Sequence, residues 1–464
     1  MCRFRSCSPR SACASCSIWR FGVCFDLELF LDAQGNFSNR GWDFSSGKEA
    51  ANSLLRKIRY IRFNRSGDPV YVKIGGLDNV TFGYGFIVDR FTNMLNYPGE
   101  KLFGVEFELN DIGPVGISFQ TLLPDVKDFG NDGGIVAGRL AFKPFKATEK
   151  PIIGGLSIGG MIATDLNQYA PAREWDYSLH GTKWDKDEDG VTDSTYLFKT
   201  YGEEGYYSSL VQAHKSINDY DTDVAHKDEW AKKEEDRIII VGGDMVVPII
   251  SSKLLNIDLY GQSGVTLDED NDDKIYKGWG IGAPGVGVKV GPLWARLEYR
   301  HIRDKFAPGY FNTYYLNERI RRTPNVYVKE DSLPSVKLNG VFGMAGLNIK
   351  NFVIVSGAYQ RLSGEDETLD QRAEGQIALG DFLLERIPKI NKVEVFYYQT
   401  DIDKKKDKPF FYQSPTTYWG YRLGCEVVAG AFIVWETRYG WIWNEDRTEL
   451  IDDKTVTIKA GIAF

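Results

Sequence analysis

The sequence predicts an all-β protein, an antiparallel up-and-down transmembrane β-barrel of about 16–18 strands. Three observations predict it. The last ten residues alternate between apolar and polar or small side chains without a break. Strand-length segments with one apolar face recur along the chain, and the connections between them alternate between short and long. Together these features indicate one large sheet with one face toward lipid.

The final segment, 455–464, carries the clearest strand pattern. Its apolar positions are Val456, Ile458, Ala460, Ile462 and Phe464. Successive side chains of a strand point to opposite faces, so this set lies on one side. We expect it to be the closing strand of the barrel.

This tail resembles the C-terminal signal of bacterial outer-membrane β-barrels, in which a terminal aromatic residue and alternate apolar residues mark the last strand for insertion. The resemblance covers the final ten residues and is to porin-like barrels in architecture only. It implies a location in the bacterial outer membrane, with outer-membrane lipid and the barrel-assembly machinery as partners. The resemblance is also compatible with a homo-oligomer.

Composition narrows the class of protein. Of the 464 residues 43% are hydrophobic, yet no run of 18 or more apolar residues occurs, so α-helical membrane spans are excluded. Aromatic residues make up 14% of the chain and glycine occurs 48 times, which suits a β-rich protein with interfacial aromatics. The net charge of −8 argues against a nucleic-acid partner.

The first residues do not fit the barrel pattern. Five of the six cysteines lie within residues 1–24, where Cys13 and Cys16 form a CxxC without a second pair. The segment also lacks the basic start and apolar core of a signal peptide. We interpret 1–24 as a mis-called start or a non-structural segment, 25–54 as a strand or a short plug, and 55–464 as the barrel.

The strands and loops follow a regular rhythm. Leu293, Ala295, Leu297 and Tyr299 alternate with polar neighbours, and counting such segments from Asn79 onward gives about sixteen strands. Two further segments, 55–65 and 70–76, raise the number to about eighteen. The expected short periplasmic turns lie near 111–113, 145–151, 250–252, 291–292, 350–351, 386–390 and 429–430. The expected long extracellular loops lie near 89–101, 123–133, 164–236, 266–277, 302–337, 363–373, 401–416 and 444–454.

Charged residues share one parity along the strands. An Arg or Lys facing lipid at the membrane midplane costs ~2–4 kcal/mol, so we expect these residues to face a polar interior. The pore-lining candidates are Glu106, Glu108, Arg139, Asp258, Arg296, Glu298, Arg300, Glu394, Arg422, Glu426, Glu436 and Arg438. In a soluble sandwich the same faces would be solvated. Tyr421, Trp435, Tyr439, Trp441 and Trp443 on the other parity suit an interfacial belt.

A calcium motif stands in the longest loop. Asp185, Asp187, Asp189 and Asp193, with the Val191 carbonyl and a glycine between them, match the DxDxDGxxD start of a calcium loop and resemble the EF-hand or thrombospondin-type-3 loop. Position 12 is Tyr196, so the bidentate carboxylate is missing. The alternative is an acidic solvated loop, and the barrel itself requires no cofactor.

The sequence favours a protein that is not an enzyme. It has four histidines, and none is spaced with a serine along one strand face. The expected function is porin-like diffusion of small hydrophilic solutes, with loop 164–236 or loop 302–337 narrowing the lumen. Arg319, Arg321 and Arg322 are the constriction candidates.

Three alternatives remain open. The first is a non-conducting barrel that acts as an adhesin or structural protein through acidic loops, and the second is a transporter of hydrophobic molecules with residues 25–54 as plug. The third is a secreted β-protein that binds glycans through calcium.

Overall fold

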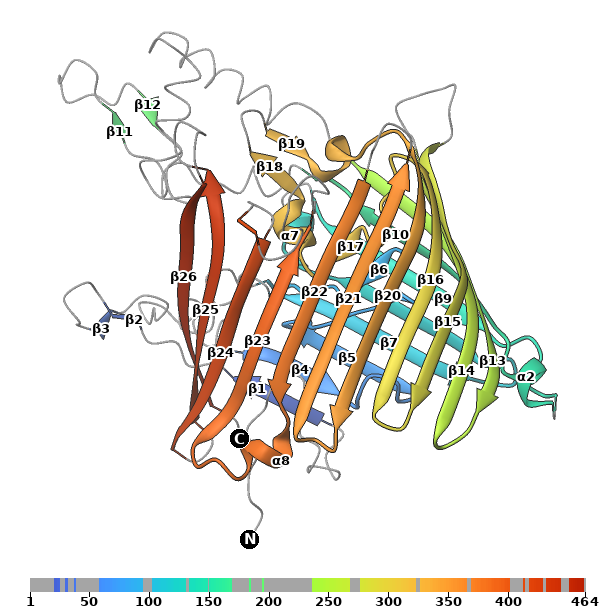
Figure 1. Ribbon diagram of the computed structural model, residues 1–464, viewed down its shortest axis with the longest axis horizontal. Coiled ribbons are helices and arrows are strands. Elements are labelled where there is room, and N and C mark those ends of the chain that lie inside the picture. The colour runs from blue at the N-terminus through green and yellow to red at the C-terminus, as the bar shows by residue number, and fades with distance from the viewer. Residues whose placement is uncertain are drawn as a thin grey trace.

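The computed structural model describes residues 21–25, 58–94, 102–130, 133–148, 150–168, 236–267, 276–322, 326–364, 369–400, 417–428, 431–443 and 450–462, with the short pieces 30–31, 37–38, 183–184, 194–195 and 412–413. Its dominant feature is one antiparallel sheet of 18 strands (Figure 1). The wall strands are β1 (Phe21–Phe25), β4 (Ile58–Phe63), β5 (Val70–Gly75), β7 (Gly104–Ile112), β8 (Ile117–Leu123), β9 (Ile135–Phe142), β10 (Ser157–Asp165), β13 (Ile238–Ser251), β14 (Leu255–Leu267), β15 (Tyr276–Val290), β16 (Leu293–Asp304), β20 (Lys337–Ile349), β21 (Val353–Gly364), β22 (Leu369–Leu379), β23 (Ile390–Gln399), β24 (Thr417–Val428), β25 (Ala431–Trp443) and β26 (Leu450–Ile462).

Each wall strand from β4 to β26 pairs with the next wall strand along the chain, which is an up-and-down order. β1 pairs with β4 over its whole length, but it meets β26 only at Phe25 and Ile462. The sheet therefore curls into a barrel wall whose last seam is joined at a single residue pair. The expectation of an all-β up-and-down barrel with about 16–18 strands is confirmed.

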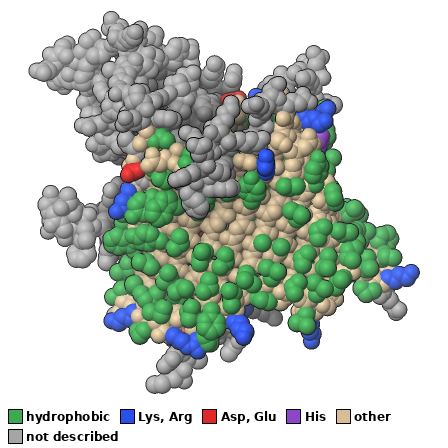
Figure 2. Space-filling model, viewed as in Figure 1, with side chains coloured by type: hydrophobic (Ala, Val, Ile, Leu, Met, Phe, Trp, Pro, Cys, Tyr) green, Lys and Arg blue, Asp and Glu red, His purple; other side chains and the backbone are tan. Residues whose placement is uncertain are grey.

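The outer face of the wall is apolar. Leu140, Ile162, Leu297, Ile377 and Trp435 all point outward, with 43–59% of their surface exposed. In Figure 2 hydrophobic side chains cover the visible wall, and charged ones gather at its edges. An apolar band on a strand wall is what lipid contact requires.

The terminal strand is a wall strand, as expected. In the register of β25 and β26, Ile458 pairs with Trp435, and Val456 is 44% exposed on the outer face. The rings of Trp419 and Tyr439 stack with centroids 4.4 Å apart. The Trp443 side chain lies outside the described residues.

The N-terminal part differs from expectation. Residues 21–24 belong to wall strand β1, so the wall begins inside the segment interpreted as non-structural. Within 25–54 the structure describes Phe25 and a separate two-stranded pair, β2 (Phe30–Leu31) and β3 (Phe37–Ser38), which does not join the wall.

The expected strand after Asn79 is not a wall strand, so the wall has one strand fewer from that point than the expected sixteen. Residues 76–94 instead turn inward and contain only the two-residue β6 (Val88–Asp89). We call this segment the first insert.

A second segment, with described residues 304–322 and 326–336, also packs inside the ring, and we call it the second insert. It contains β17 (Phe311–Asn312), helix α7 (Tyr315–Glu318), the hairpin β18 (Ile320–Arg322) and β19 (Val326–Val328), and the 3-10 turn η2 (Lys329–Ser332). β17 pairs in parallel with β6, which joins the two inserts.

The remaining elements are short. They are helix α2 (Pro151–Gly154) and helix α8 (Asp381–Leu384) at the short-turn end, the 3-10 turn η1 (Asp128–Gly130), and the pair β11 (Lys183–Trp184) and β12 (Ser194–Thr195). Among the residues that the structure describes, no helix is both long and apolar enough to cross a membrane.

Candidate functional site in the barrel interior

The first insert folds back on itself before it meets the wall. Val80 and Phe91 exchange backbone hydrogen bonds of 2.9 and 2.8 Å, and the Gly85 N–H donates to the Phe82 carbonyl. Gly85 has a φ of +82°, and a Cβ there would stand 2.5 Å from Asp89 Oδ1. Glycine is therefore required for this turn, which directs apolar side chains toward the second insert.

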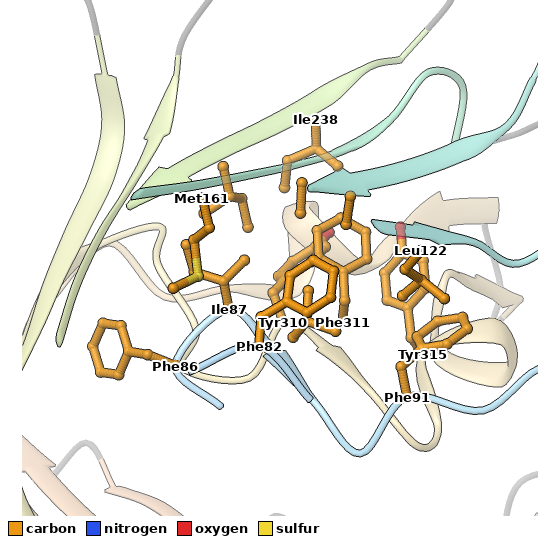
Figure 3. Packing of buried hydrophobic residues seen from close by; sticks show 14 of the residues in the cluster. Phe82, Phe86, Ile87, Phe91, Leu122, Met161, Ile238, Tyr310, Phe311 and Tyr315 are labelled. Carbon is orange, nitrogen blue, oxygen red and sulfur yellow. The ribbon is translucent and has the colours of Figure 1, made fainter. Parts of the chain in front are cut away.

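The two inserts share an apolar core inside the ring (Figure 3). Phe82, Phe86 and Phe91 of the first insert and Tyr310 and Phe311 of the second have at most 1% of their surface exposed. Wall residues complete the cluster, and they are Leu122, Ile135, Ala137, Met161, Ala163, Ile238, Ile240, Ile302, Leu338 and Leu362. Side chains thus fill the interior beside β8 to β21, and we call this region the packed half.

Wall glycines make room for this core. A Cβ on Gly264 or Gly280 would come within 2.7 or 2.6 Å of the Phe306 ring, and one on Gly282 within 2.9 Å of Phe86. These glycines lie on strands β14 and β15 and face the interior. Small wall residues opposite large insert residues give close packing.

The first insert is fixed to the wall by charged and polar contacts. Arg296 of β16 pairs with Asp89 at 3.0 Å and also donates to the Tyr84 carbonyl. Arg90 pairs with Glu374 of β22. Burial alone would raise the pKa of Asp89, but Arg90 and Arg296 hold this pKa below its ordinary value. The insert is therefore tied to strands on the side opposite its own.

Tyr84 adds a second attachment. Its hydroxyl donates to Asp258 Oδ2 at 2.9 Å, its N–H donates to Gln262 Oε1 at 3.0 Å, and its ring stacks on Tyr260 with centroids 3.7 Å apart. Burial and the Asp258 carboxylate raise the pKa of Tyr84, so the phenol stays protonated.

The second insert is fixed by a buried ion pair. Arg319 has 2% of its side chain exposed and places Nε 2.5 Å from Asp165 Oδ2, at the end of β10. Tyr315 donates to the same carboxylate at 2.7 Å, and Arg319 Nη2 donates to the Asn167 carbonyl at 2.7 Å. The expectation that Arg319 narrows an open lumen is wrong, because this guanidinium is consumed by an internal anchor. Arg321 and Arg322 lie in β18, and their side chains are outside the described residues.

In the packed half, the expected pore-lining residues have partners inside the protein. Arg139 pairs with Asp244 at 2.6 Å, and Arg300 pairs with Glu298 at 2.5 Å. Arg300 and Glu298 are each 1% exposed. The expectation of a wet interior does not hold here, because these charges are buried under the inserts.

The interior beside β23 to β25 has a different character, and we call it the charged half. Arg422 of β24 lies between Glu394 of β23 at 2.5 Å and Glu436 of β25 at 2.8 Å. Arg438 of β25 lies over the Tyr418 ring. The Arg422 side chain is 27% exposed, against 1% for Arg300. Glu436 and Glu394 are 13% and 6% exposed, so this row is accessible mainly at Arg422.

Three other candidates lie near the first and last strands. Glu106 accepts from the Tyr71 hydroxyl at 3.4 Å, and Glu108 accepts from Ser66 and from the Gly67 N–H. Glu426 is half-buried. Among the twelve candidates, the structure thus joins Glu298 with Arg300, and Arg422 with Glu394 and Glu436.

A small pocket lies where both inserts meet wall strands β20 to β23. Its lining includes Asp89 and Arg90 of the first insert, Tyr314 of the second, and Arg372 and Tyr398 of the wall. The Tyr314 and Tyr398 rings stack with centroids 3.7 Å apart. The inserts therefore end at a surface with charges of both signs.

The predicted calcium loop, 185–193, lies outside the described residues. Within the described part of the chain, no group of three or more His, Cys, Asp or Glu side chains is placed to hold a metal ion. Of the histidines only His301 is described. It lies on the outer wall beside Asn339, with its ring 5.2 Å from Trp279.

No protein-family model matches the chain, and no curated protein matches its sequence. Among solved structures, it is similar to CdiB from Escherichia coli, with a TM-score of 0.37 and 9% identity over 87% of this chain and 65% of that one. It is also similar to OmpT, an outer membrane protein of Vibrio cholerae, with a TM-score of 0.31 and 12% identity over 86% of this chain and 98% of that one. For OccK8 (OprE) of Pseudomonas aeruginosa the TM-score is 0.32, with 9% identity over 87% of this chain and 90% of that one. The chain spans only 65% of the length of CdiB.

At TM-scores this low, none of these likenesses bears on function. The fold stands on the strand order, the apolar outer face and the polar residues that the wall encloses. These features give the chain the architecture of a transmembrane β-barrel.

Proposed function

We propose that the protein is an outer-membrane channel for passive diffusion of small hydrophilic solutes, with the solute path along the charged half of the interior. The observation that carries this proposal is the row of Glu394, Arg422 and Glu436 across three adjacent strands, in which the Arg422 side chain is 27% exposed. Charges that face a lumen set its ion preference. The proposal assigns no catalytic residue and requires no cofactor.

The two inserts give such a channel a restricted bore. They fill the packed half with side chains, so a solute path is confined to the other side. We therefore still propose that loop 302–337 narrows the solute path, but through the volume of the whole second insert. Arg319 contributes only by anchoring that insert to Asp165.

The other functional expectations receive less support. A path for hydrophobic molecules needs an open apolar surface, but the described apolar residues of the interior pack against one another. The adhesin alternative depends on the acidic loops and on calcium at 185–193, which lie outside the described residues. Calcium binding, homo-oligomer formation and recognition by the assembly machinery stay predictions.

The test is single-channel conductance of the refolded protein in a planar bilayer. We expect stable steps with a measurable ion preference, and Arg422→Gln should shift that preference toward cations because it removes a positive charge from an accessible row. Arg361→Gln is the matched control, since Arg361 lies exposed on the outer parity of β21. A folded barrel that conducts nothing contradicts the proposal.

A further inference from the structure

The short-turn end of the barrel exposes apolar and cationic side chains together. In the turn between β9 and β10, Phe145 and Ile152 are 48% and 45% exposed, and Lys146 and Lys150 stand beside them. Between β13 and β14, Leu254 is 77% exposed next to Lys253. The same arrangement therefore recurs in two separate turns.

The turn between β22 and β23 repeats it a third time. Phe382 and Ile387 are both exposed, and Arg386 and Lys389 are their neighbours. The Arg386 guanidinium lies 3.4 Å from the centre of the Phe382 ring. In Figure 2, Lys and Arg side chains appear along the lower edge of the wall among hydrophobic ones.

The charge of this end opposes the charge of the chain. We define the rim as the described residues of 64–69, 111–117, 143–156, 251–255, 289–293, 349–353 and 380–390. Its cations are Arg65, Lys143, Lys146, Lys150, Lys253, Lys289, Lys350, Arg386 and Lys389, and its acids are Asp68, Asp111, Asp381 and Glu385. Nine cations against four acids leave a surplus of five among these described residues, and of four when Glu149 of the same turn is counted from the sequence, although the whole chain carries −8.

The acids of the rim do not neutralise this surplus. Asp111 is occupied by Lys143 at 2.9 Å and by Lys146 at 3.1 Å. Among the described residues, Lys150, Lys253 and Lys389 make no side-chain ion pair, so their ammonium groups are available to a partner.

We propose that this rim binds the anionic headgroups of the phospholipid leaflet on the short-turn side. Apolar side chains beyond the strand ends are stable at the boundary between acyl chains and headgroups, where Lys and Arg reach the phosphates with their long stems. Each cation close to an anionic membrane surface adds to this attraction. The rim thus selects anionic phospholipid over zwitterionic lipid, whether or not the lumen conducts.

The test compares lipids retained by the full chain in nanodiscs that contain phosphatidylglycerol and phosphatidylethanolamine, counted by native mass spectrometry. The rim variant is Lys150→Gln, Lys253→Gln and Lys389→Asn. Asparagine is chosen because Lys389 has a φ of +66°. The matched control is Arg303→Gln, Lys337→Gln and Arg361→Gln, which removes the same charge from exposed positions at the other end of the wall.

We expect the original chain and the control to retain phosphatidylglycerol preferentially, and the rim variant to lose about tenfold or more of that preference. Equal retention of the two lipids by the original chain, or equal losses in both variants, overturns the proposal. Displacement of the lipid by glycerol 3-phosphate alone also overturns it, because it would indicate a site for free phosphate. A heat-modifiable gel shift confirms folding of both variants, and unchanged conductance separates this result from the channel proposal.

Discussion

The two halves of the interior use the same residue types for different purposes. In the packed half, Arg300 and Glu298 are almost wholly buried beneath the inserts. In the charged half, Arg422 joins Glu394 and Glu436 and keeps a quarter of its side chain accessible. Charge on the inner face of a barrel therefore does not by itself identify a pore, because the surroundings decide whether it anchors a loop or meets solutes.

The largest expected effect breaks the anchor of the packed half. Arg319→Met leaves Asp165 buried without its partner, and removing one member of a buried ion pair costs about 3–5 kcal/mol. The free energy of unfolding, measured by urea titration in lipid vesicles, should fall by that amount. The double variant Arg319→Met with Asp165→Leu should recover much of the loss, and no recovery would show that the pair has another role.

A smaller effect tests how tightly the packed half is filled. Gly280→Ala places a Cβ 2.6 Å from the Phe306 ring, and overpacking of this kind costs about 1–3 kcal/mol. Gly138→Ala is the matched control, because its nearest neighbour would be the Gln120 carbonyl at 3.8 Å. Equal unfolding free energies for the two variants would contradict a filled interior.

The charged half should respond weakly in stability. Arg422→Gln should change the unfolding free energy by about 1 kcal/mol or less, since partly exposed ion pairs contribute little. The same variant should change ion preference, as described above. A large loss of stability without any change in preference would mean that the row is structural.

The last expected effect depends on pH and concerns Asp89, which lies between Arg90 and Arg296. Its pKa is lowered in the folded state, so its contribution to stability is complete above the ordinary pKa of a carboxyl group. The contribution is lost as the pH falls below about 4 and approaches the folded-state value. Asp89→Asn should therefore reduce the loss of thermal stability between about pH 4 and lower pH, measured by thermal unfolding at a series of pH values. An unchanged loss would mean that other carboxyl groups cause it.

The wall was largely predictable from the sequence, because lipid on one side enforces strict alternation. Val456 and Ile458 predicted the outer face of the last strand, and the charged parity of Arg296 and Glu298 predicted the inner face. The same signals could not show what the interior holds. A charged residue that faces water and one that faces an insert give the same alternating pattern in the sequence.

The inserts were missed because their residues imitate strands. Apolar residues such as Phe82 and Phe86 within 79–88 suggested another wall segment, whereas their rings fill the interior. A usable signal lay in β15, where Gly278, Gly280 and Gly282 repeat on the inward parity. Recurrent glycine on an inner face marks the close approach of another segment.

The ties of the first insert also constrain the order of assembly. Tyr84 bonds to Asp258, which lies 174 residues later in the chain, and Arg90 bonds to Glu374, which lies 284 residues later. Contacts between residues so distant in sequence form slowly, because a long loop must close before they stabilise anything. The interior can therefore reach its final arrangement only when β14 and β22 have both joined the wall.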